Sequence, residues 1–196
     1  MENKLDKNYW DKRYIDQTAV WDMGQVSPPL KAYIDQLTNK DIAILIPGCG
    51  NAYEAEYLLS AGFTNITLID LSSVLVQAIE QKLSFYNGKQ LQVICGDFFD
   101  LQQKFDLVLE QTFFCALDPS LRKKYVVKMA DILNPGGRLV GLLFNRDFEE
   151  SPPFGGSATE YQELFSTRFN IYTMELCYNS IERRKGSELF INFQII

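Results

Sequence analysis

The sequence predicts an α/β domain in which helices cover both faces of a mostly parallel sheet. Two observations carry this prediction. Short apolar runs alternate with amphipathic stretches and short links throughout residues 42–144, which is the pattern of parallel strands joined by helical crossovers. Two longer strand-like runs, 169–177 and 187–195, follow with one loop between them, so they should pair antiparallel. We therefore expect a three-layer, Rossmann-like sheet, mostly parallel, with an antiparallel C-terminal strand.

Hydrophobic periodicity and capping residues give the expected elements in order. The expected strands of the parallel part are residues 42–46, 66–69, 91–95, 105–109 and 138–144. The expected helices are residues 7–15, 28–37, 52–61, 72–84, 118–133 and 157–165. Ser27 before Pro28 and Asp118 before Pro119 suit an N-cap followed by proline in the first turn. Ser157 with Glu160 has the spacing of a capping box.

Length, composition and charge narrow the class of protein. A chain of 196 residues is enough for one domain with a sizeable core. The hydrophobic fraction of 46% and the charged fraction of 22% are those of a globular protein. The net charge of −6 disfavours binding to a nucleic-acid backbone. Arg183, Arg184 and Lys185 form a small basic cluster, which we interpret as a solvated turn.

The cysteines and the lack of histidine limit the chemistry. Cys49, Cys95, Cys115 and Cys177 are far apart in sequence and do not have the spacing of a zinc site. They are typical of reduced, mostly buried thiols in an intracellular protein. The chain has no histidine, so the commonest metal ligand and the commonest general base are missing, and we expect no metal.

Hydropathy gives no indication of a membrane or export segment. Residues 1–14 are charged and contain no apolar stretch of the kind found in secretory signals. The longest apolar runs, such as 139–144, are far shorter than the roughly 20 residues needed to span a bilayer. The cytoplasm is therefore the expected location, and a membrane is not an expected partner.

A glycine-rich turn and an acid indicate an adenosine ligand at the carboxyl ends of the strands. Gly48 and Gly50 lie between the first strand and its helix, where the backbone can approach a ligand closely. Asp70 ends the second strand, where a carboxylate can accept hydrogen bonds from both ribose hydroxyls. The alternatives are a tight turn alone for the glycines and a helix cap for Asp70.

The third strand adds a second acid and an aromatic side chain. Asp97 can accept from an exocyclic adenine amine, and Phe98 can cover the ring face. Tyr53 stands where the dinucleotide fingerprint requires its third glycine, and a bulky residue there hinders close helix–strand contact. This argues against a nicotinamide-linked oxidoreductase, although adenosine recognition by Asp70 is common to both classes.

Seven short segments together resemble the thiopurine S-methyltransferase family, within the class I S-adenosylmethionine-dependent methyltransferases and nearest the halide/thiol methyltransferases. These segments are Trp21-Asp22-Met23-Gly24, Ser27-Pro28-Pro29, Pro47-Gly48-Cys49-Gly50, Phe105-Asp106-Leu107, Gln111-Thr112-Phe113-Phe114-Cys115-Ala116, Asp118-Pro119 and Arg184-Lys185-Gly186. They span nearly the whole chain. The Trp-Asp-x-Gly and Thr-Phe-Phe-Cys-Ala segments are the most specific, because generic methyltransferases lack them.

The resemblance implies one seven-stranded methyltransferase domain and assigns roles to its residues. Its parts would be an N-terminal helical lid at 1–38, a cofactor-binding core at 42–144, and a C-terminal helix and antiparallel strand pair at 151–196. The implied cofactor is S-adenosylmethionine, held by Trp10, Trp21, Gly48, Cys49, Gly50, Asp70, Leu71, Asp97, Phe98 and Glu110. The candidate acceptor pocket contains Trp21, Gln111, Phe113, Phe114 and Tyr178. No catalytic residue is assigned.

Some positions depart from the family or the wider class. Ala52 stands where many methyltransferases have a third glycine, and Ile46 where many have an acid. Glu110-Gln111 stands where some relatives have Asp followed by an aromatic residue or Arg, which leaves the acceptor open. Cys115 has no histidine to pair with, so we interpret it as a structural thiol. Tyr14, Tyr172, Tyr178 and Asn179 are candidate polar pocket residues, with cross-strand surface positions as the favoured alternative.

Methyl transfer from a sulfonium is an in-line displacement, and an anionic, polarisable acceptor needs no general base. A dry aromatic site helps by weakening the hydration of the anion. The leading hypothesis is therefore a methyltransferase for a small soft nucleophile: a thiol, a thiopurine-like compound, bisulfide or a halide. The alternatives are a methyltransferase for a nitrogen or oxygen acceptor and a catalytically silent cofactor-binding protein. The sequence leaves the acceptor, the physiological role and the oligomeric state open.

Overall fold

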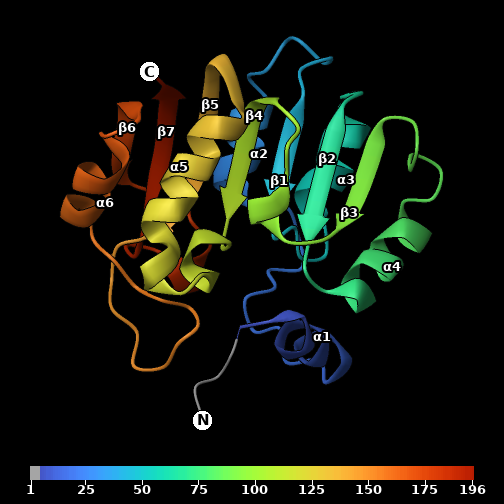
Figure 1. The fold of residues 1–196 in the computed structure, drawn as a ribbon, viewed down its shortest axis with the longest axis horizontal. Helices are drawn as coiled ribbons and strands as arrows, with labels where there is room; N and C mark the ends of the chain where they lie inside the picture. Colours follow the sequence, from blue (N-terminus) through green and yellow to red (C-terminus); the bar gives the residue numbers. More distant parts are fainter. Residues whose placement is uncertain (1–4) are drawn as a thin grey trace.

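The central sheet contains seven strands in the order β3-β2-β1-β4-β5-β7-β6 within residues 5–196, the part of the chain that a computed structural model describes (Figure 1). The strands are β1 (Ile44–Pro47), β2 (Ile66–Asp70), β3 (Leu91–Cys95), β4 (Phe105–Gln111), β5 (Leu133–Phe144), β6 (Phe169–Leu176) and β7 (Glu188–Ile195). Strand β7 runs antiparallel to both of its neighbours, and strands β1–β5 pair in parallel. The fold class expected from the sequence is confirmed.

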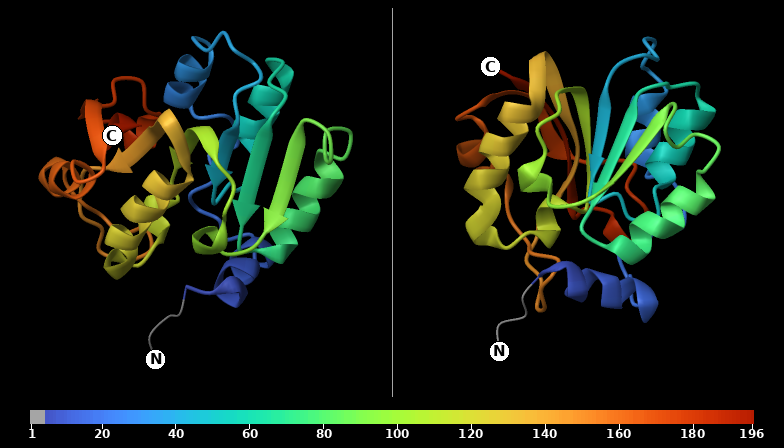
Figure 2. Two further views of the ribbon diagram at one scale, coloured as in Figure 1. Left: turned by 45° about the horizontal axis from the view of Figure 1, so that its top comes forward. Right: turned by 45° about the vertical axis from the view of Figure 1, so that its right-hand side comes forward.

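Helices cover both faces of this sheet, as Figure 2 shows. One face carries α2 (Pro28–Ile34), α3 (Tyr53–Ser60) and α4 (Ser73–Lys82), and the other carries α5 (Arg122–Ile132) and α6 (Ala158–Phe165). Two buried clusters fill the space between sheet and helices. Ile44 and Leu58 belong to the cluster under α2–α4, and Val108 and Met129 belong to the cluster under α5 and α6. All four residues of β1 are buried, and the three before its proline are strongly apolar, as a strand buried on both faces requires.

Several helix caps agree with the sequence. The Ser72 hydroxyl accepts from the Leu75 N–H at 3.2 Å, and the Ser157 hydroxyl accepts from the Glu160 N–H at 3.3 Å. Ser27 occupies the N-cap position of α2 as expected, but its side chain makes no capping hydrogen bond, and its own N–H donates to the Glu54 carboxylate at 2.9 Å. Ser27 is therefore a buried tie between α2 and α3.

Three element boundaries differ from the sequence prediction by three residues or more. Helix α2 ends at Ile34 instead of residue 37. Asp118 caps a short 3-10 helix, Pro119–Leu121, and the α-helix begins only at Arg122. Strand β5 starts at Leu133 because the 134–137 segment, expected to be a turn, already follows the edge of β4, where Phe105 is paired with Leu133.

The first helix, α1 (Lys7–Ile15), lies across the carboxyl-end edge of the sheet beside α4 (Figure 1). Asp11 joins the two helices: it accepts from the Ser72 hydroxyl at 2.7 Å and from the Val74 N–H at 3.2 Å. Burial alone would raise the pKa of Asp11, but these bonds and the one from Lys7 lower it to about 2. The negative charge therefore lies at the N-terminus of α4, where the helix dipole favours it.

The 1–38 segment, expected to be a lid, has two different parts. Residues 1–4 lie outside the described residues. Helix α1 and the following loop cover the end of the sheet, whereas α2 belongs to the core, since Leu30 and Ile34 are fully buried. Proline at the first positions of α2 suits a helix start, and its apolar face packs toward α3.

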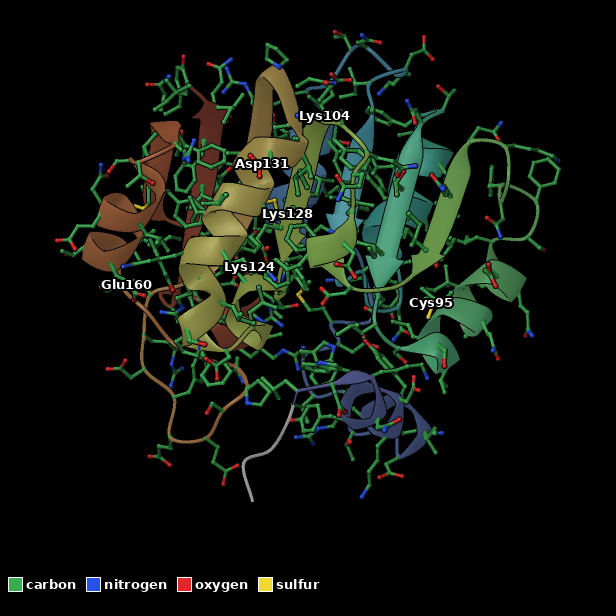
Figure 3. The ribbon with its side chains drawn as sticks, viewed as in Figure 1. Cys95, Lys104, Lys124, Lys128, Asp131 and Glu160 are labelled. Carbon is green, nitrogen blue, oxygen red and sulfur yellow. The ribbon has the colours of Figure 1, made fainter. Side chains whose placement is uncertain are left out.

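The link between β3 and β4 is fastened to α5 by two lysines (Figure 3). Lys128 Nζ donates to the Leu101 carbonyl at 2.7 Å, and Lys104 Nζ donates to the Asp131 carbonyl. These bonds hold the segment that follows Asp97 and Phe98 against the helix layer. Within residues 5–196, every helix falls short of the length and apolar character that crossing a membrane requires.

Candidate active site

A cavity of about 1050 Å³ opens at the carboxyl ends of the parallel strands. It lies where β1 and β4 are neighbours although β2 and β3 follow β1 along the chain, which is the switch point at which open α/β sheets bind ligands. Small-molecule sites measure about 300–1,000 Å³, so this cavity is as large as the largest of them. Its walls come from the ends of β1 to β5, from α1, and from the segments 20–21, 146–154 and 183–187.

Two acids line one end of the cavity. Asp70 Oδ1 accepts from the Ser72 N–H at 2.9 Å, and Asp97 Oδ1 accepts from the Phe99 N–H at 2.8 Å. Burial raises the pKa of Asp70 to about 6, with backbone N–H donors opposing the rise. At neutral pH Asp70 is therefore mainly ionised and can accept hydrogen bonds from a ligand.

The glycine turn after β1 passes directly beside an aromatic ring from β4. Gly48 has φ +56°, and its N–H donates to the Ile69 carbonyl at 2.8 Å. A Cβ at position 48 would lie 3.0 Å from Phe113 Cγ and closer still to Cδ2. Glycine is thus needed here twice, for the left-handed backbone and for the space that the Phe113 ring fills.

Aromatic side chains of the N-terminal segment cover the same end. The Trp10 and Trp21 rings meet edge to face with centroids 5.5 Å apart, and Tyr14 meets Trp21 at 6.0 Å. All three residues line the cavity. Burial and the nearby Asp70 raise the pKa of the Tyr14 phenol, so it remains protonated. Tyr14, for which a surface position was favoured from sequence, is therefore a partly buried residue of the cavity wall.

The basic segment 183–185 is a solvated turn only in part: Arg183 and Lys185 are exposed, as expected, but Arg184 is not. Arg184 is buried, pairs with Glu188 at 3.1 Å, and donates from Nη2 to the Trp21 carbonyl at 2.8 Å. Arg183 donates from Nη2 to the Asp22 carbonyl at 2.6 Å. The sequence prediction was wrong for Arg184, because nothing in the local pattern shows that the link between β6 and β7 contacts the N-terminal loop.

Asp22, in the Trp-Asp-Met-Gly segment, joins this loop to the glycine turn. Its carboxylate accepts from the Gly24 N–H at 2.7 Å, from Asn51 Nδ2, and from the Tyr53 hydroxyl at 3.3 Å. The loop is therefore held from both sides, by Asn51 beside the glycines and by the arginines of the C-terminal segment. This gives a physical role to a segment that the sequence singled out only by resemblance.

The other end of the cavity is largely apolar and was mostly missed from sequence. Its lining includes Leu117, Leu121, Phe144, Arg146, Phe148, Phe154 and Arg183. The Phe154 N–H donates to the Cys115 carbonyl at 2.7 Å, which fastens the 146–154 segment to the end of β4. That segment is a loop without periodicity, so the sequence contains no pattern that would place its side chains in a pocket.

The structure brings eight of the predicted site residues together. The cavity is lined by Trp10, Trp21, Gly48, Asp70, Leu71, Asp97, Phe98 and Phe113. Gly50 belongs to the same turn, with φ +50°, but is not a lining residue. Cys49 points into the core, where burial raises the pKa of its thiol.

Four other predicted residues lie elsewhere. Phe114 is fully buried in an aromatic cluster, with its centroid 5.0 Å from that of Tyr125, because consecutive residues of the turn point in different directions. Tyr178 is 87% exposed on the link after β6 and lies outside the cavity. Glu110 turns toward α5 and not into the cavity. Gln111 does not line the cavity, but both atoms of its amide are shielded from solvent without a hydrogen-bond partner in residues 5–196.

The cysteines fit the expected reduced thiols with one exception. Cys49, Cys115 and Cys177 are buried, whereas Cys95 is exposed at the end of β3, as Figure 3 shows. Burial, with the nearby Glu110, raises the pKa of the Cys115 thiol, so it remains protonated. Cys115 lines the cavity as part of its wall.

Comparison with known proteins decides the family. The family model described as thiopurine S-methyltransferase (TPMT) matches residues 5–190. The chain belongs to the thiopurine S-methyltransferase family. A probable thiol methyltransferase 2 of Arabidopsis thaliana is 30% identical over 159 residues, which cover 79% of this chain and 70% of that protein. A thiocyanate methyltransferase 1 of Brassica oleracea is 27% identical over 188 residues, covering 94% and 83% of the two chains.

Solved structures agree on the fold of this thiopurine S-methyltransferase family member. The 1,6-didemethyltoxoflavin-N1-methyltransferase of Burkholderia thailandensis, crystallised with S-adenosylhomocysteine, superposes with a TM-score of 0.77 at 17% identity. The match covers 96% of this chain and 86% of that chain. The resemblance drawn from sequence is thus confirmed, and the chain is an S-adenosylmethionine-dependent methyltransferase.

Proposed function

We propose that this enzyme transfers the methyl group of S-adenosylmethionine, in line, to a small soft nucleophile such as a thiol, a thiopurine-like compound, bisulfide or a halide. One observation carries the proposal: a single cavity joins an end with two acids and an aromatic cover to an apolar end bordered by arginines. The names of the relatives, a thiol and a thiocyanate methyltransferase, support an acceptor of this class.

The acidic end fits the cofactor by the chemistry of its side chains. Asp70 can accept from the ribose hydroxyls, Asp97 can accept from the adenine amine, and Phe98 can cover the ring. Gly48 brings backbone to the cavity wall in a conformation that other residues rarely adopt. Trp10 and Trp21 cover this end of the cavity and would exclude water from the bound cofactor. When bound, S-adenosylmethionine supplies an electrophilic methyl group on a cationic sulfonium.

The apolar end would receive the acceptor. Leu117, Leu121 and Phe154 offer no hydrogen bonds from their side chains, so they weaken the hydration of a soft anion and leave it reactive. Arg146 and Arg183 give this end a positive potential, which favours an anionic acceptor. The unpaired amide of Gln111, next to the cavity residue Thr112, is our candidate for orienting the acceptor after a small side-chain rotation.

The protonation states favour an acceptor that is already ionised. Tyr14 and Cys115 line the cavity, but their raised pKa values keep both groups protonated at neutral pH, so neither is suited to act as a general base. Asp118 also lines it, and hydrogen bonds from Ser120 lower the pKa of its carboxyl, which makes it a weak base. A hydroxyl or protonated amine acceptor would need a base to remove its proton, and none of these three groups suits that role, so they favour an acceptor that is already anionic.

Transfer of label tests the proposal. Purified protein receives methyl-labelled S-adenosylmethionine together with iodide, bisulfide, an aryl thiol or 6-mercaptopurine in separate reactions, and volatile and extractable label is counted. We expect label in the product of at least one soft nucleophile. We also expect Asp70→Ala to lose affinity for S-adenosylhomocysteine with its circular dichroism spectrum unchanged. Wild-type affinity in that variant would refute the assignment of the cofactor end.

A negative result would also be informative. Tight binding of S-adenosylhomocysteine with no label in any product would refute the soft-nucleophile proposal. Label transferred to amines or phenols added to the same assay would then identify a nitrogen or oxygen acceptor. No transfer to any acceptor class would favour a protein that binds the cofactor without turnover.

A further inference from the structure

Glu110 is a buried carboxylate whose oxygens face three donors of the protein itself. Its Oε1 accepts from the N–H groups of Phe113 at 2.8 Å and Phe114 at 2.9 Å. Its Oε2 accepts from the Tyr125 hydroxyl at 2.6 Å. The side chain is 1% exposed and does not line the cavity. Glu110 thus makes no approach to a ligand, and its bonds organise the turn that follows β4.

That turn contains a conformation which its sequence does not favour. Thr112 has φ +61°, in the left-handed region that is unfavourable for a β-branched residue. Such a conformation persists only where the surroundings hold it. The two bonds that Glu110 Oε1 accepts come from the two residues immediately after Thr112. The carboxylate therefore holds the turn closed across the strained residue.

The conformation of this turn sets the position of the Phe113 ring. The ring fills the space beside Gly48, where even a methyl group would collide with it. It also meets the Phe98 ring at a centroid distance of 5.2 Å, and both rings line the cavity. Phe113 therefore touches the glycine turn and the adenine end while Thr112, next to it, lines the wall toward the acceptor end.

We propose that Glu110 is a positioning residue for methyl transfer, which acts by holding the Thr112–Phe113 turn so that the Phe113 ring packs against Gly48 between the two ends of the cavity. The proposal rests on the function proposed above. A small shift of such a wall changes the alignment of two bound reactants, and a misplacement of about 1 Å can cost roughly 100-fold in rate.

The first test compares two substitutions of Glu110. Glu110→Gln keeps an oxygen for both N–H groups and places its NH₂ toward the Tyr125 oxygen, so we expect S-adenosylhomocysteine affinity and kcat within about threefold of wild type. Glu110→Ala removes the acceptor, and we expect affinity to fall by roughly tenfold and kcat by roughly 100-fold. Glu163→Ala, an exposed glutamate on α6, is the matched control.

The second test is a rescue at the strained residue. Thr112→Gly removes the penalty for φ +61°, so in the Glu110→Ala background it should restore a large part of the lost S-adenosylhomocysteine affinity. Four proteins are compared: wild type, Glu110→Ala, Thr112→Gly and the double variant. Calorimetric titration measures the affinity of each, and thermal melting measures its stability. A merely structural role for Glu110 predicts wild-type affinity in every variant that is folded at the assay temperature, and that result would overturn the proposal.

The readouts separate this proposal from the proposed function. Affinity for S-adenosylhomocysteine needs no acceptor, so the Glu110 series is decided even if no soft nucleophile is methylated. If Glu110→Ala does not fold, Tyr125→Phe removes one of the three donors to Glu110 without emptying the core, and Tyr125→Phe/Thr112→Gly repeats the rescue in that background. Wild-type affinity and kcat in Tyr125→Phe would refute the positioning role, as would a loss that Thr112→Gly leaves unchanged, whereas a loss that Thr112→Gly largely restores would support it.

Discussion

Arg184 donates a hydrogen bond from Nη2 to the carbonyl oxygen of Trp21 at 2.8 Å, which joins the C-terminal link before β7 to the loop that covers the cavity. The same guanidinium pairs with Glu188 at 3.1 Å, and both side chains are buried. Two distant parts of the chain thus close one site. The Trp21 ring is carried by a loop whose backbone is fixed from the opposite end of the sequence.

Arg184→Ala should destabilise the protein strongly. The substitution leaves Glu188 as a buried charge without its partner, and breaking such a pair costs about 3–5 kcal/mol. Urea unfolding followed by circular dichroism measures the loss. Arg183→Ala is the comparison, since Arg183 is exposed and contacts the loop through its backbone carbonyls only, so we expect a loss below about 1 kcal/mol. Equal losses in the two variants would contradict this account.

The parallel core was predictable from sequence because each of its strands is a short apolar run closed by a turn residue. Ile44 and Leu45 show this: they are consecutive in β1 and fully buried, and they belong to the clusters on opposite faces of the sheet, so burial alone selects their residue types. Asp70 and Asp97 could be found because they end strands at the edge where such folds bind ligands.

The contacts that close the site could not be found in this way. Arg184 looks like any residue of a charged turn, and only the folded chain brings it to Trp21. Glu110 was expected in the cofactor site and Phe114 in the acceptor site. Their sequence positions place both residues near the carboxyl end of β4 but do not show which way each side chain points. The positive φ of Thr112 reverses the course of the turn, and a threonine gives no local signal for that conformation.

Gly48→Ala should abolish cofactor binding, and Gly50→Ala provides a matched control in the same turn. Both glycines have positive φ, so each substitution costs about 1–2 kcal/mol of backbone strain. A Cβ at Gly50 meets open space, whereas a Cβ at Gly48 collides with the Phe113 ring. Calorimetric titration should therefore show a much larger loss of S-adenosylhomocysteine affinity for Gly48→Ala. Similar losses would mean that strain alone decides and that the contact with Phe113 is unimportant.

Affinity for S-adenosylhomocysteine should weaken as the pH falls through 6. Burial raises the pKa of Asp70 to about 6. In the cofactor site that we propose, the ribose hydroxyls would donate to the ionised carboxylate, so protonation would remove the binding-competent form. Only about a tenth of the protein is competent one unit below the pKa, which predicts roughly a tenfold weaker apparent affinity at pH 5 than at pH 7.5. In Asp70→Asn the affinity should be weak and nearly constant. The same slope in both proteins would show that another group titrates.

The ionisation of Glu110 should make the fold less stable as the pH rises from about 4.5 to 7. Burial raises the pKa of this carboxyl to about 7, against the opposing bonds from Tyr125 and the Phe114 and Phe113 N–H groups. A folded-state pKa above the ordinary value means that the folded protein holds the proton more tightly. The resulting stabilisation is complete below about pH 4.5 and is lost as the pH rises through 7.

A shift of this size corresponds to about 3 kcal/mol, and Glu110→Gln has no proton to lose. The neighbouring Tyr125 and Cys115 have raised pKa values and stay neutral throughout this range, so they do not obscure the effect. Urea denaturation at pH 5 and pH 8 measures this difference. Relative to wild type, the glutamine variant should be more stable at pH 8 than at pH 5 by about 2–3 kcal/mol. Parallel pH profiles for the two proteins would mean that the three hydrogen bonds keep Glu110 ionised in the folded state, because donors to a carboxylate favour its charged form.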